Sequence, residues 1–314
     1  MTTDKKVKEV MERADLTIAA LTTNGGLLQP EQSQTFIDEV QEQPTMLSQV
    51  RVIPMNSPTY HVHKIGFAER ILRAARIAGG AQDDGDNARN LRVADRSAPV
   101  TRQIELVSKE VMAEVRIPYE VVEDNIERGN FESHVMRLMA ERAAQDLEEW
   151  AIRGDTGSGD AYLALVDGLV KKATTNVVDN LNAGPNPDMF RDAHLAMPQR
   201  YLRNMGSLRH FMTVQDEIRY RSNVSNRATG LGDSALQTTG SLTPYGVAID
   251  RTPFMTPNTA LLTFPQNIMF GIHRDIMVET ERSIRSREFV IVLSTRVDVQ
   301  YEDEEAVVKI ININ

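Results

Sequence analysis

The stretch NFESHVMRLMAERAAQDLEEWAIRG, residues 130–154, is the clearest single element of the chain. Asn130 suits the N-cap of a helix, and Gly154 suits the position just after its end. About 24 helical residues would make a rod of roughly 35 Å, twice the usual helix length. Apolar side chains recur on one face, and charged ones, Glu148 among them, lie opposite. We therefore predict a long helix packed against a sheet, with a core formed by Phe131, Val135, Leu138, Leu147 and Trp150.

Ahead of this helix, two strand-like segments flank a polar stretch. Residues 60–65 and 103–117 alternate apolar and polar side chains, and the second changes parity near its middle, which indicates a bulge or twist. Residues 79–87, GGAQDDGDN, are too polar to offset the entropy of ordering them. The pattern predicts a long two-stranded arm with a polar tip. Because an isolated hairpin is marginal in water, the arm needs a surface that its own chain does not obviously offer.

The rest of the chain predicts an α+β protein. An amphipathic helix is expected at 4–21, followed by a shorter helix at 30–42 and a strand at 50–54. Beyond residue 170 the pattern is mixed, with helices expected at 187–197, 199–204 and 215–221 and strands at 209–214, 246–250, 260–264 and 275–280. An irregular loop is expected at 222–243. The chain closes with two strand segments, 289–301 and 306–313.

Composition excludes several classes of protein. The chain has no cysteine among its 314 residues, which excludes disulfides, thiolate nucleophiles and Cys-based metal sites. Its formal net charge of −9 is opposite to that of most proteins whose main task is to grip nucleic acid. The longest run of large apolar residues, 289–293, is far shorter than a membrane span, and the N-terminus has no apolar signal region. We expect a soluble chain that is used without export and makes no membrane contact.

Two short motifs resemble enzyme signatures. Asp155-Thr156-Gly157-Ser158 matches the tetrapeptide of aspartic proteases, but it follows a charged helix and has no second copy, so a helix-terminating turn is the preferred interpretation. Residues 230–235, GLGDSA, satisfy a relaxed dinucleotide fingerprint, but a polar segment precedes them where a buried strand is needed. We expect a loop there, no catalytic residues and no cofactor.

Metal sites are not favoured either. His61 and His63 would share one face of a strand, but a third ligand at defined spacing is missing. Residues 83–87, DDGDN, resemble a calcium loop only in composition, because position 91 is a leucine where a glutamate would be needed. A solvated tip is the preferred interpretation, and adventitious binding of a divalent cation is the alternative.

Arginines gather at two places. Arg70, Arg73 and Arg76 precede the arm's tip, and three more, Arg282, Arg285 and Arg287, precede the C-terminal strands. Without interleaved aromatic residues they indicate salt bridges or interface contacts. Weak, salt-sensitive contact with nucleic acid is compatible with them, whereas sequence-specific binding is not supported.

The order of these parts resembles the HK97-fold major capsid protein of tailed bacteriophages over nearly the whole chain. The resemblance is carried by short segments: GGLLQPE at 25–31, VRVIPM at 50–55, PYEVVEDN at 118–125, the long helix ending at Gly154, DGL at 167–169 and TRVD at 295–298.

The resemblance implies a subunit that assembles into pentamers and hexamers of an icosahedral shell around double-stranded DNA. Residues 1–56 would be an N-terminal arm and the start of the P domain, 57–117 the E-loop, 118–170 the P domain with its spine helix, 171–281 the A domain, and 282–314 return strands of the P domain. The E-loop would lie across a neighbouring subunit. Its assembly residues would be Arg73, Arg76, Asp83, Asp84, Asp86 and Arg89.

Partners follow from the same resemblance: further copies of the chain, a scaffolding protein, a portal, a decoration protein and, non-specifically, packaged DNA. The protein would reside in the virion capsid after assembly in the host cytoplasm. Some members of this family crosslink covalently through a lysine of the E-loop and an asparagine of a neighbour. No lysine lies between Lys64 and Lys109 here, which argues against autocatalytic crosslinking through the arm's tip. Because only about 24 residues precede Asn24-Gly25-Gly26, a separate scaffolding protein is expected.

Two other functions stay open at this point. An encapsulin-type nanocompartment shell would have the same fold and enclose a cargo enzyme instead of a genome. A soluble α/β hydrolase or nucleotide-binding enzyme would use the motifs at Asp155 or Gly230.

Overall fold

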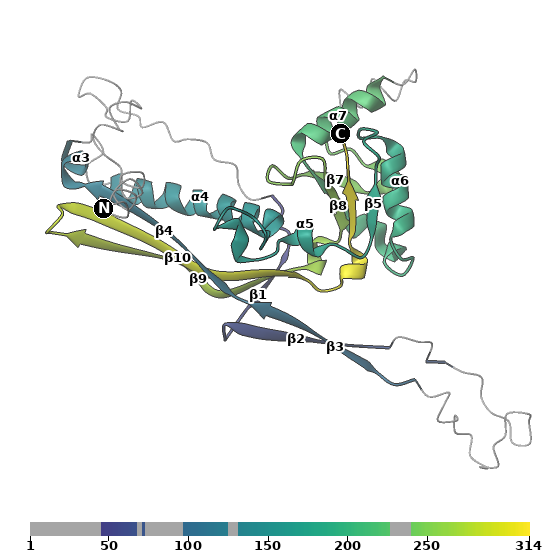
Figure 1. The fold of residues 1–314 in the computed structure, drawn as a ribbon, viewed down its shortest axis with the longest axis horizontal. Helices are drawn as coiled ribbons and strands as arrows, with labels where there is room; N and C mark the ends of the chain where they lie inside the picture. The colour runs from purple at the N-terminus through teal and green to yellow at the C-terminus, as the bar shows by residue number, and fades with distance from the viewer. Residues whose placement is uncertain (1–44, 68–70, 73–96, 125–130, 227–239) are drawn as a thin grey trace, which may run out of the picture. The chain divides into compact units, whose positions relative to one another are not determined.

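A computed structural model of the chain describes residues 45–67, 71–72, 97–124, 131–226 and 240–314. These residues form two compact units, one made of residues 59–106 and the other of the rest (Figure 1). The predicted helices at 4–21 and 30–42, the motif at 230–235 and the proposed N-cap Asn130 lie outside the described residues.

The arm contains a two-stranded sheet of β2 (Thr59–Gly66) and β3 (Val100–Val107). It is shorter than the sequence indicated. The strand expected at 103–117 breaks at Ser108. Its second half, β4 (Lys109–Pro118), pairs with β10 (Glu288–Tyr301) in a different sheet. The parity change therefore marks a switch between sheets, not a bulge within one arm.

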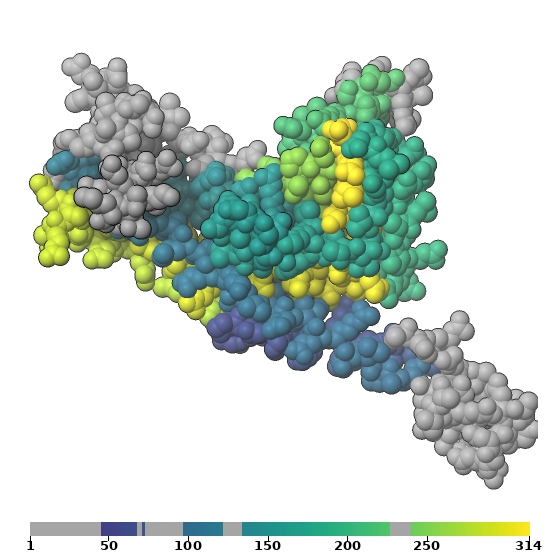
Figure 2. All heavy atoms as spheres, viewed as in Figure 1, coloured from purple at the N-terminus to yellow at the C-terminus, as the bar shows by residue number. Residues whose placement is uncertain are grey.

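A four-stranded sheet lies beneath the long helix in the order β1-β9-β10-β4. Its other strands are β1 (Arg51–Pro54), β9 (Ile268–Ser283) and β10 (Glu288–Tyr301). β9 and β10 form an antiparallel hairpin, and β1 pairs in parallel with the first part of β9. Figure 2 shows the end of this hairpin at the molecular surface, where Arg282, Arg285 and Arg287 are all exposed.

The long helix is confirmed as α4 (Phe131–Arg153), preceded by a short α3 (Tyr119–Asp124). α4 runs along β4 and β10 (Figure 1). Its predicted stripe is buried unevenly: Leu147 and Trp150 are buried, whereas Val135 and Leu138 are only half-buried. The side chain of Phe131 lies outside the described residues. The first half of the stripe is therefore less deeply buried than the second, although Val135 packs against a core cluster formed by Ile117, Val121, Phe289 and Ile291.

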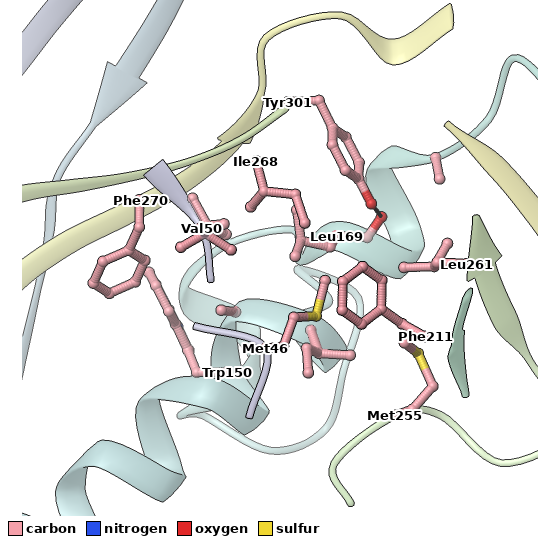
Figure 3. Packing of buried hydrophobic residues seen from close by; sticks show 14 of the residues in the cluster. Met46, Val50, Trp150, Leu169, Phe211, Met255, Leu261, Ile268, Phe270 and Tyr301 are labelled. Atoms are coloured by element: carbon pink, nitrogen blue, oxygen red, sulfur yellow. Dashed lines mark hydrogen bonds between the residues drawn. The ribbon is translucent and has the colours of Figure 1, made fainter. Parts of the chain in front are cut away.

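The C-terminal end of α4 enters the main core. Trp150 belongs to one buried cluster with residues from distant parts of the chain, among them Met46, Phe211, Phe270 and Tyr301 (Figure 3). The Tyr301 hydroxyl donates a hydrogen bond to the Leu169 carbonyl at 3.0 Å, so this buried polar group is satisfied.

A five-stranded sheet has the order β5-β11-β8-β6-β7. Its strands are β5 (Val177–Asp179), β6 (Arg209–Met212), β7 (Ala248–Arg251), β8 (Ala260–Thr263) and β11 (Val308–Ile311). Helices α6 (Pro187–Ala196) and α7 (Val214–Ser225) begin at side-chain caps, with Asn186 accepting from the Met189 N–H and Thr213 from the Asp216 N–H. β5 was not predicted.

The two last strands of the chain lie in different sheets. β10 belongs to the four-stranded sheet, whereas β11 pairs with β5 and β8 in the five-stranded one. The sequence analysis grouped both strands within residues 282–314, whereas the strand pairing separates them. Short apolar strands carry no signal in their own sequence that specifies which sheet they join.

The short elements between these strands complete the fold. They are α5 (Leu169–Lys172) and the 3₁₀ turns Leu163–Leu165, Leu202–Ser207, Pro244–Gly246, Pro265–Asn267 and Glu304–Ala306. The predicted helix at 199–204 is thus a turn followed by a 3₁₀ segment.

Candidate assembly surfaces

The arm exposes large apolar side chains. Ile65 is 71 % exposed and Leu72 is 83 % exposed, and Phe67 and Ile71 are each 52 % exposed. A two-stranded sheet buries little surface of its own, so this unit has little to hold it together in isolation. The predicted assembly residues Arg73, Arg76, Asp83, Asp84, Asp86 and Arg89 lie outside the described residues.

The root of the arm is held by hydrogen bonds. The Ser108 backbone N–H donates to the Pro58 carbonyl at 2.8 Å, which joins the outgoing and returning chain. Asp298 on β10 accepts from the Val107 N–H at 2.7 Å and from the Val299 N–H at 2.8 Å. Burial raises the pKa of the Asp298 carboxyl, and Lys172, 4.0 Å away, opposes that shift. Asp298 was not predicted, because nothing in its local sequence marks it as buried.

An apolar groove lies between α4 and the inner face of β4 and β10. Its volume is about 550 Å³, and its apolar lining includes Val111, Val115, Val135, Leu138 and Met139. These five residues are all half-buried. In the part of the chain that the structure describes, β4 pairs only with β10, so the groove adjoins an edge strand.

Polar groups stand at one end of the groove. Arg142 pairs with Asp146 at 3.0 Å, and the Tyr162 hydroxyl donates to the Asp146 backbone carbonyl at 2.8 Å. Burial raises the pKa of the Asp146 carboxyl, with Arg142 opposing the shift, and burial also raises the pKa of Tyr162. At this end of the groove, the Arg142–Asp146 ion pair is therefore partly shielded from water.

Glu148 holds the first described residues of the chain. It was predicted to lie on the polar face of the long helix, but it is fully buried. Its carboxylate accepts the backbone N–H groups of Thr45, Met46 and Leu47 at 3.3, 2.5 and 3.3 Å. Helix periodicity could not reveal this role, because the partners lie about 100 residues away along the chain.

The aspartic-protease-like tetrapeptide is a structural turn, as predicted. Lys171 bridges two carboxylates, at 2.6 Å from Asp155 and 2.8 Å from Asp167. The Lys171 ammonium and the Thr156 N–H hold the pKa of Asp167 at about 2. The Lys171 ammonium therefore keeps both acids ionised. The protease mechanism instead requires two carboxylates that share one proton.

This turn depends on two glycines whose backbones touch. The Gly168 N–H donates to the Gly154 carbonyl at 2.7 Å. A Cβ atom on Gly168 would lie 2.6 Å from the Gly154 nitrogen and 2.6 Å from the Ile152 carbonyl oxygen. The end of α4 and the start of α5 can pack this closely only because neither position carries a side chain.

Histidines form no recognisable metal site in the described ranges. His61 and His63 lie on the same exposed face of β2, as predicted. No cluster of three or more possible metal ligands occurs among the described residues. His194 and His210 form a buried pair, with ring centroids 5.2 Å apart. Burial, with the neighbouring His194, lowers the pKa of His210 well below its usual value.

No helix in the described ranges combines the length and apolar character required to cross a membrane.

Comparison with known proteins identifies the family. Residues 24–311 match the phage capsid family. A curated relative from Bacillus subtilis (strain 168), the putative prophage capsid protein YqbE, is 37 % identical over 318 residues and covers 98 % of each chain.

Solved structures share the fold at low sequence identity. The capsid of a native GTA particle has a TM-score of 0.65 at 14 % identity, covering 94 % of this chain and 99 % of its own. The satellite phage P4 procapsid, solved with its size-determination protein Sid, has a TM-score of 0.61 at 13 % identity and covers 95 % and 98 %. The SrpI encapsulin of Synechococcus elongatus PCC 7942 has a TM-score of 0.59 at 11 % identity and covers 95 % and 96 %.

The family match and the curated relative decide between the functions left open by the sequence. They exclude the hydrolase and nucleotide-binding interpretations and favour a phage capsid over an encapsulin. The chain belongs to the phage capsid family and is a structural major capsid protein with the HK97-like fold, a subunit of an icosahedral virion shell and not an enzyme.

Proposed function

We propose that the chain assembles as pentamers and hexamers of a shell around double-stranded DNA, and that its arm lies across a neighbouring subunit. The supporting observation is the arm's exposed apolar surface, above all Leu72 and Ile65. Contacts of this kind, repeated around closed rings, can hold a shell together without any tight pairwise interface.

The domain assignment is part of this proposal. The four-stranded sheet with α4 would be the P domain, the five-stranded sheet with α6 and α7 the A domain, and residues 59–106 the E-loop. Strand pairing suggests two changes to the boundaries expected from sequence. β4 would count with the P domain, and β11 with the A domain.

The arm's role can be tested with Ile71→Ser/Leu72→Ser and a matched control, Ile71→Val/Leu72→Met. We expect the serine variant to fold with an unchanged melting temperature but to lose shells in sedimentation velocity and negative-stain microscopy. The conservative variant should assemble normally. Normal shells from the serine variant, or its global unfolding, would contradict an intersubunit arm.

Further partners belong to the proposal: a separate scaffolding protein, a portal, a decoration protein and non-specific contact with packaged DNA. The P4 procapsid, which includes the Sid protein, supports the idea that a separate protein directs assembly. We propose that this assembly takes place in the host cytoplasm. Expression of the chain with and without the accompanying phage proteins tests the need for a separate scaffolding protein. Closed shells of uniform size should form only when those proteins are present.

DNA content separates the phage shell from an encapsulin. Particles purified after induction of the complete phage should contain double-stranded DNA that resists nuclease. Particles that instead contain a cargo enzyme and no genome would favour the encapsulin function.

A further inference from the structure

The groove beside α4 is an apolar surface that the described residues leave open. Val135, Leu138 and Met139 on α4 face Val111 and Val115 on β4, and all five are half-buried. Burying such side chains is worth about 25 cal/mol per Å² of apolar surface removed from water. A complementary apolar segment would therefore gain stability by filling the groove.

The described chain begins beside this groove. Thr45, Met46 and Leu47 are held by the Glu148 carboxylate, and the neighbours of Glu148 on α4, Leu147 and Glu149, both line the groove. Met46 is also fully buried in the main core. Residues 1–44 are therefore tethered to the same helix that forms one wall of the groove.

The sequence of the tethered segment matches the groove. Residues 4–21 have the apolar periodicity of an amphipathic helix, with the stripe Val7, Val10, Met11, Ala14, Ile18 and Leu21. As a helix, 18 residues would measure about 27 Å, and the 13 residues of α4 from Val135 to Leu147 extend about 20 Å. The two carboxylates in the groove lining already have cationic partners, since Asp146 pairs with Arg142 and Glu149 with Arg153. The match therefore rests on the length and the apolar stripe of residues 4–21.

The tether favours this occupant over a freely diffusing one. Residues 22–44 could span up to about 50 Å, because the helix expected at 30–42 contributes only about 20 Å and the remaining residues extend by about 3.3 Å each. The groove lies within that distance of Thr45, so the effective concentration of the segment would be in the millimolar range.

We propose that residues 4–21 dock as a helix in the α4/β4 groove of their own subunit, with the stripe Val7–Leu21 filling it. This contact goes beyond the proposed shell function and does not depend on the arm. It places the N-terminal segment on the spine helix, where it would compete with any other protein that uses the same groove.

Protection of a single thiol tests the proposal, because the natural chain has no cysteine. Met139→Cys places a thiol in the groove of the full-length protein. We expect maleimide to label it slowly, and about tenfold or more faster when Val10→Ser/Met11→Ser/Ile18→Ser is added, which corresponds to about 1.4 kcal/mol of lost docking free energy. Glu9→Ser/Glu12→Ser/Asp15→Ser, on the opposite face, is the matched control and should leave the rate unchanged.

Other occupants give different results. Rapid labelling in the full-length Met139→Cys protein would overturn the proposal. Protection that survives the stripe variant but disappears with Ile71→Ser/Leu72→Ser would show that a neighbour's arm fills the groove instead, and would also overturn it.

A crosslink tests whether docking is within one subunit. Ala14→Cys/Ala143→Cys treated with a short bismaleimide should give an intrachain crosslink. Shells co-assembled from Ala14→Cys and Ala143→Cys single variants should give no dimer on a denaturing gel. A dimer band from the mixed shells would show docking between subunits and contradict the proposal.

Discussion

The carboxylate of Glu148 accepts the backbone N–H of Met46 at 2.5 Å inside the core, although the two residues are 102 positions apart in the chain. It accepts the neighbouring N–H groups of Thr45 and Leu47 as well. One buried acid thus holds the turn that leads into β1 against α4.

Glu148→Ala should be strongly destabilising. Removing the acceptor leaves backbone N–H groups buried without a partner, at a cost of about 1–3 kcal/mol for each group that water cannot reach. Urea unfolding of the subunit measures the loss. Glu141→Ala, at an exposed position of the same helix, should change stability by less than about 0.5 kcal/mol. Equal effects of the two substitutions would contradict the role assigned to Glu148.

Gly168→Ala should distort the junction between α4 and α5. Its methyl group would lie 2.6 Å from backbone atoms of residues 152 and 154, and such overpacking typically costs about 1–3 kcal/mol, occasionally more. Gly159→Ala is the control, because a Cβ there meets nothing within 4 Å. Thermal unfolding compares the two, and a Gly168→Ala protein as stable as the control would refute the close-packing argument.

The two halves of α4 should respond differently to truncation. Trp150→Ala removes a fully buried side chain and should cost about 3–5 kcal/mol. Leu138→Ala removes a half-buried side chain and should cost clearly less. This comparison uses a subunit that lacks residues 1–24, so that the N-terminal segment proposed to dock in the groove cannot cover Leu138. Chemical denaturation of both variants in that background decides it; similar losses would mean that the first half of the stripe is as well packed as the second.

Acid should weaken the Asp167–Lys171 network. Because Lys171 and Thr156 lower the pKa of Asp167 from 3.8 to about 2, its contribution to stability is present above pH 3.8 and lost as the pH falls toward 2. The effect is modest, since the pair is largely exposed. Lys171→Met should flatten the pH dependence of unfolding in that window, and an unchanged slope would contradict the assignment.

His210 should add a second acid response at higher pH. Its pKa is lowered by burial and by His194, so the folded state favours the neutral ring, and stability falls as the pH drops below the ordinary value of 6.5. His210→Phe should reduce the loss of melting temperature between pH 7 and pH 5, whereas His61→Phe, at an exposed position, should not. If both variants keep the full loss, another group is responsible.

Local sequence was sufficient where an element depends on its own periodicity. The span of α4 and the strand at Thr59–Gly66 are both visible in the periodicity of their apolar residues. The parity change within 103–117 was also visible, but it was interpreted as a bulge or twist and not as the break at Ser108. The interpretation of Asp155-Thr156-Gly157-Ser158 as a turn also followed from its local context.

Sequence reasoning failed where the partner is distant. β4 was recognised as a strand but placed in the arm, and β11 was grouped with β10. A strand's pattern specifies its buried face and not the strand beside it. Glu148 and Asp298 are acidic residues of the kind usually found at a protein surface. They are buried because their carboxylates accept hydrogen bonds from the backbone N–H groups of Met46 and Val107, which lie far away along the chain. The half-open groove likewise depends on the distance between α4 and β4. The sequence of either element alone does not specify that distance.

Electron cryo-microscopy of the assembled shell tests the central claim most directly, since it shows which subunit the arm contacts. We expect Phe67, Ile71 and Leu72 of one copy to be buried against the body of the adjacent copy. An arm whose apolar side chains pack on their own subunit, with no contact across the boundary, would contradict the account.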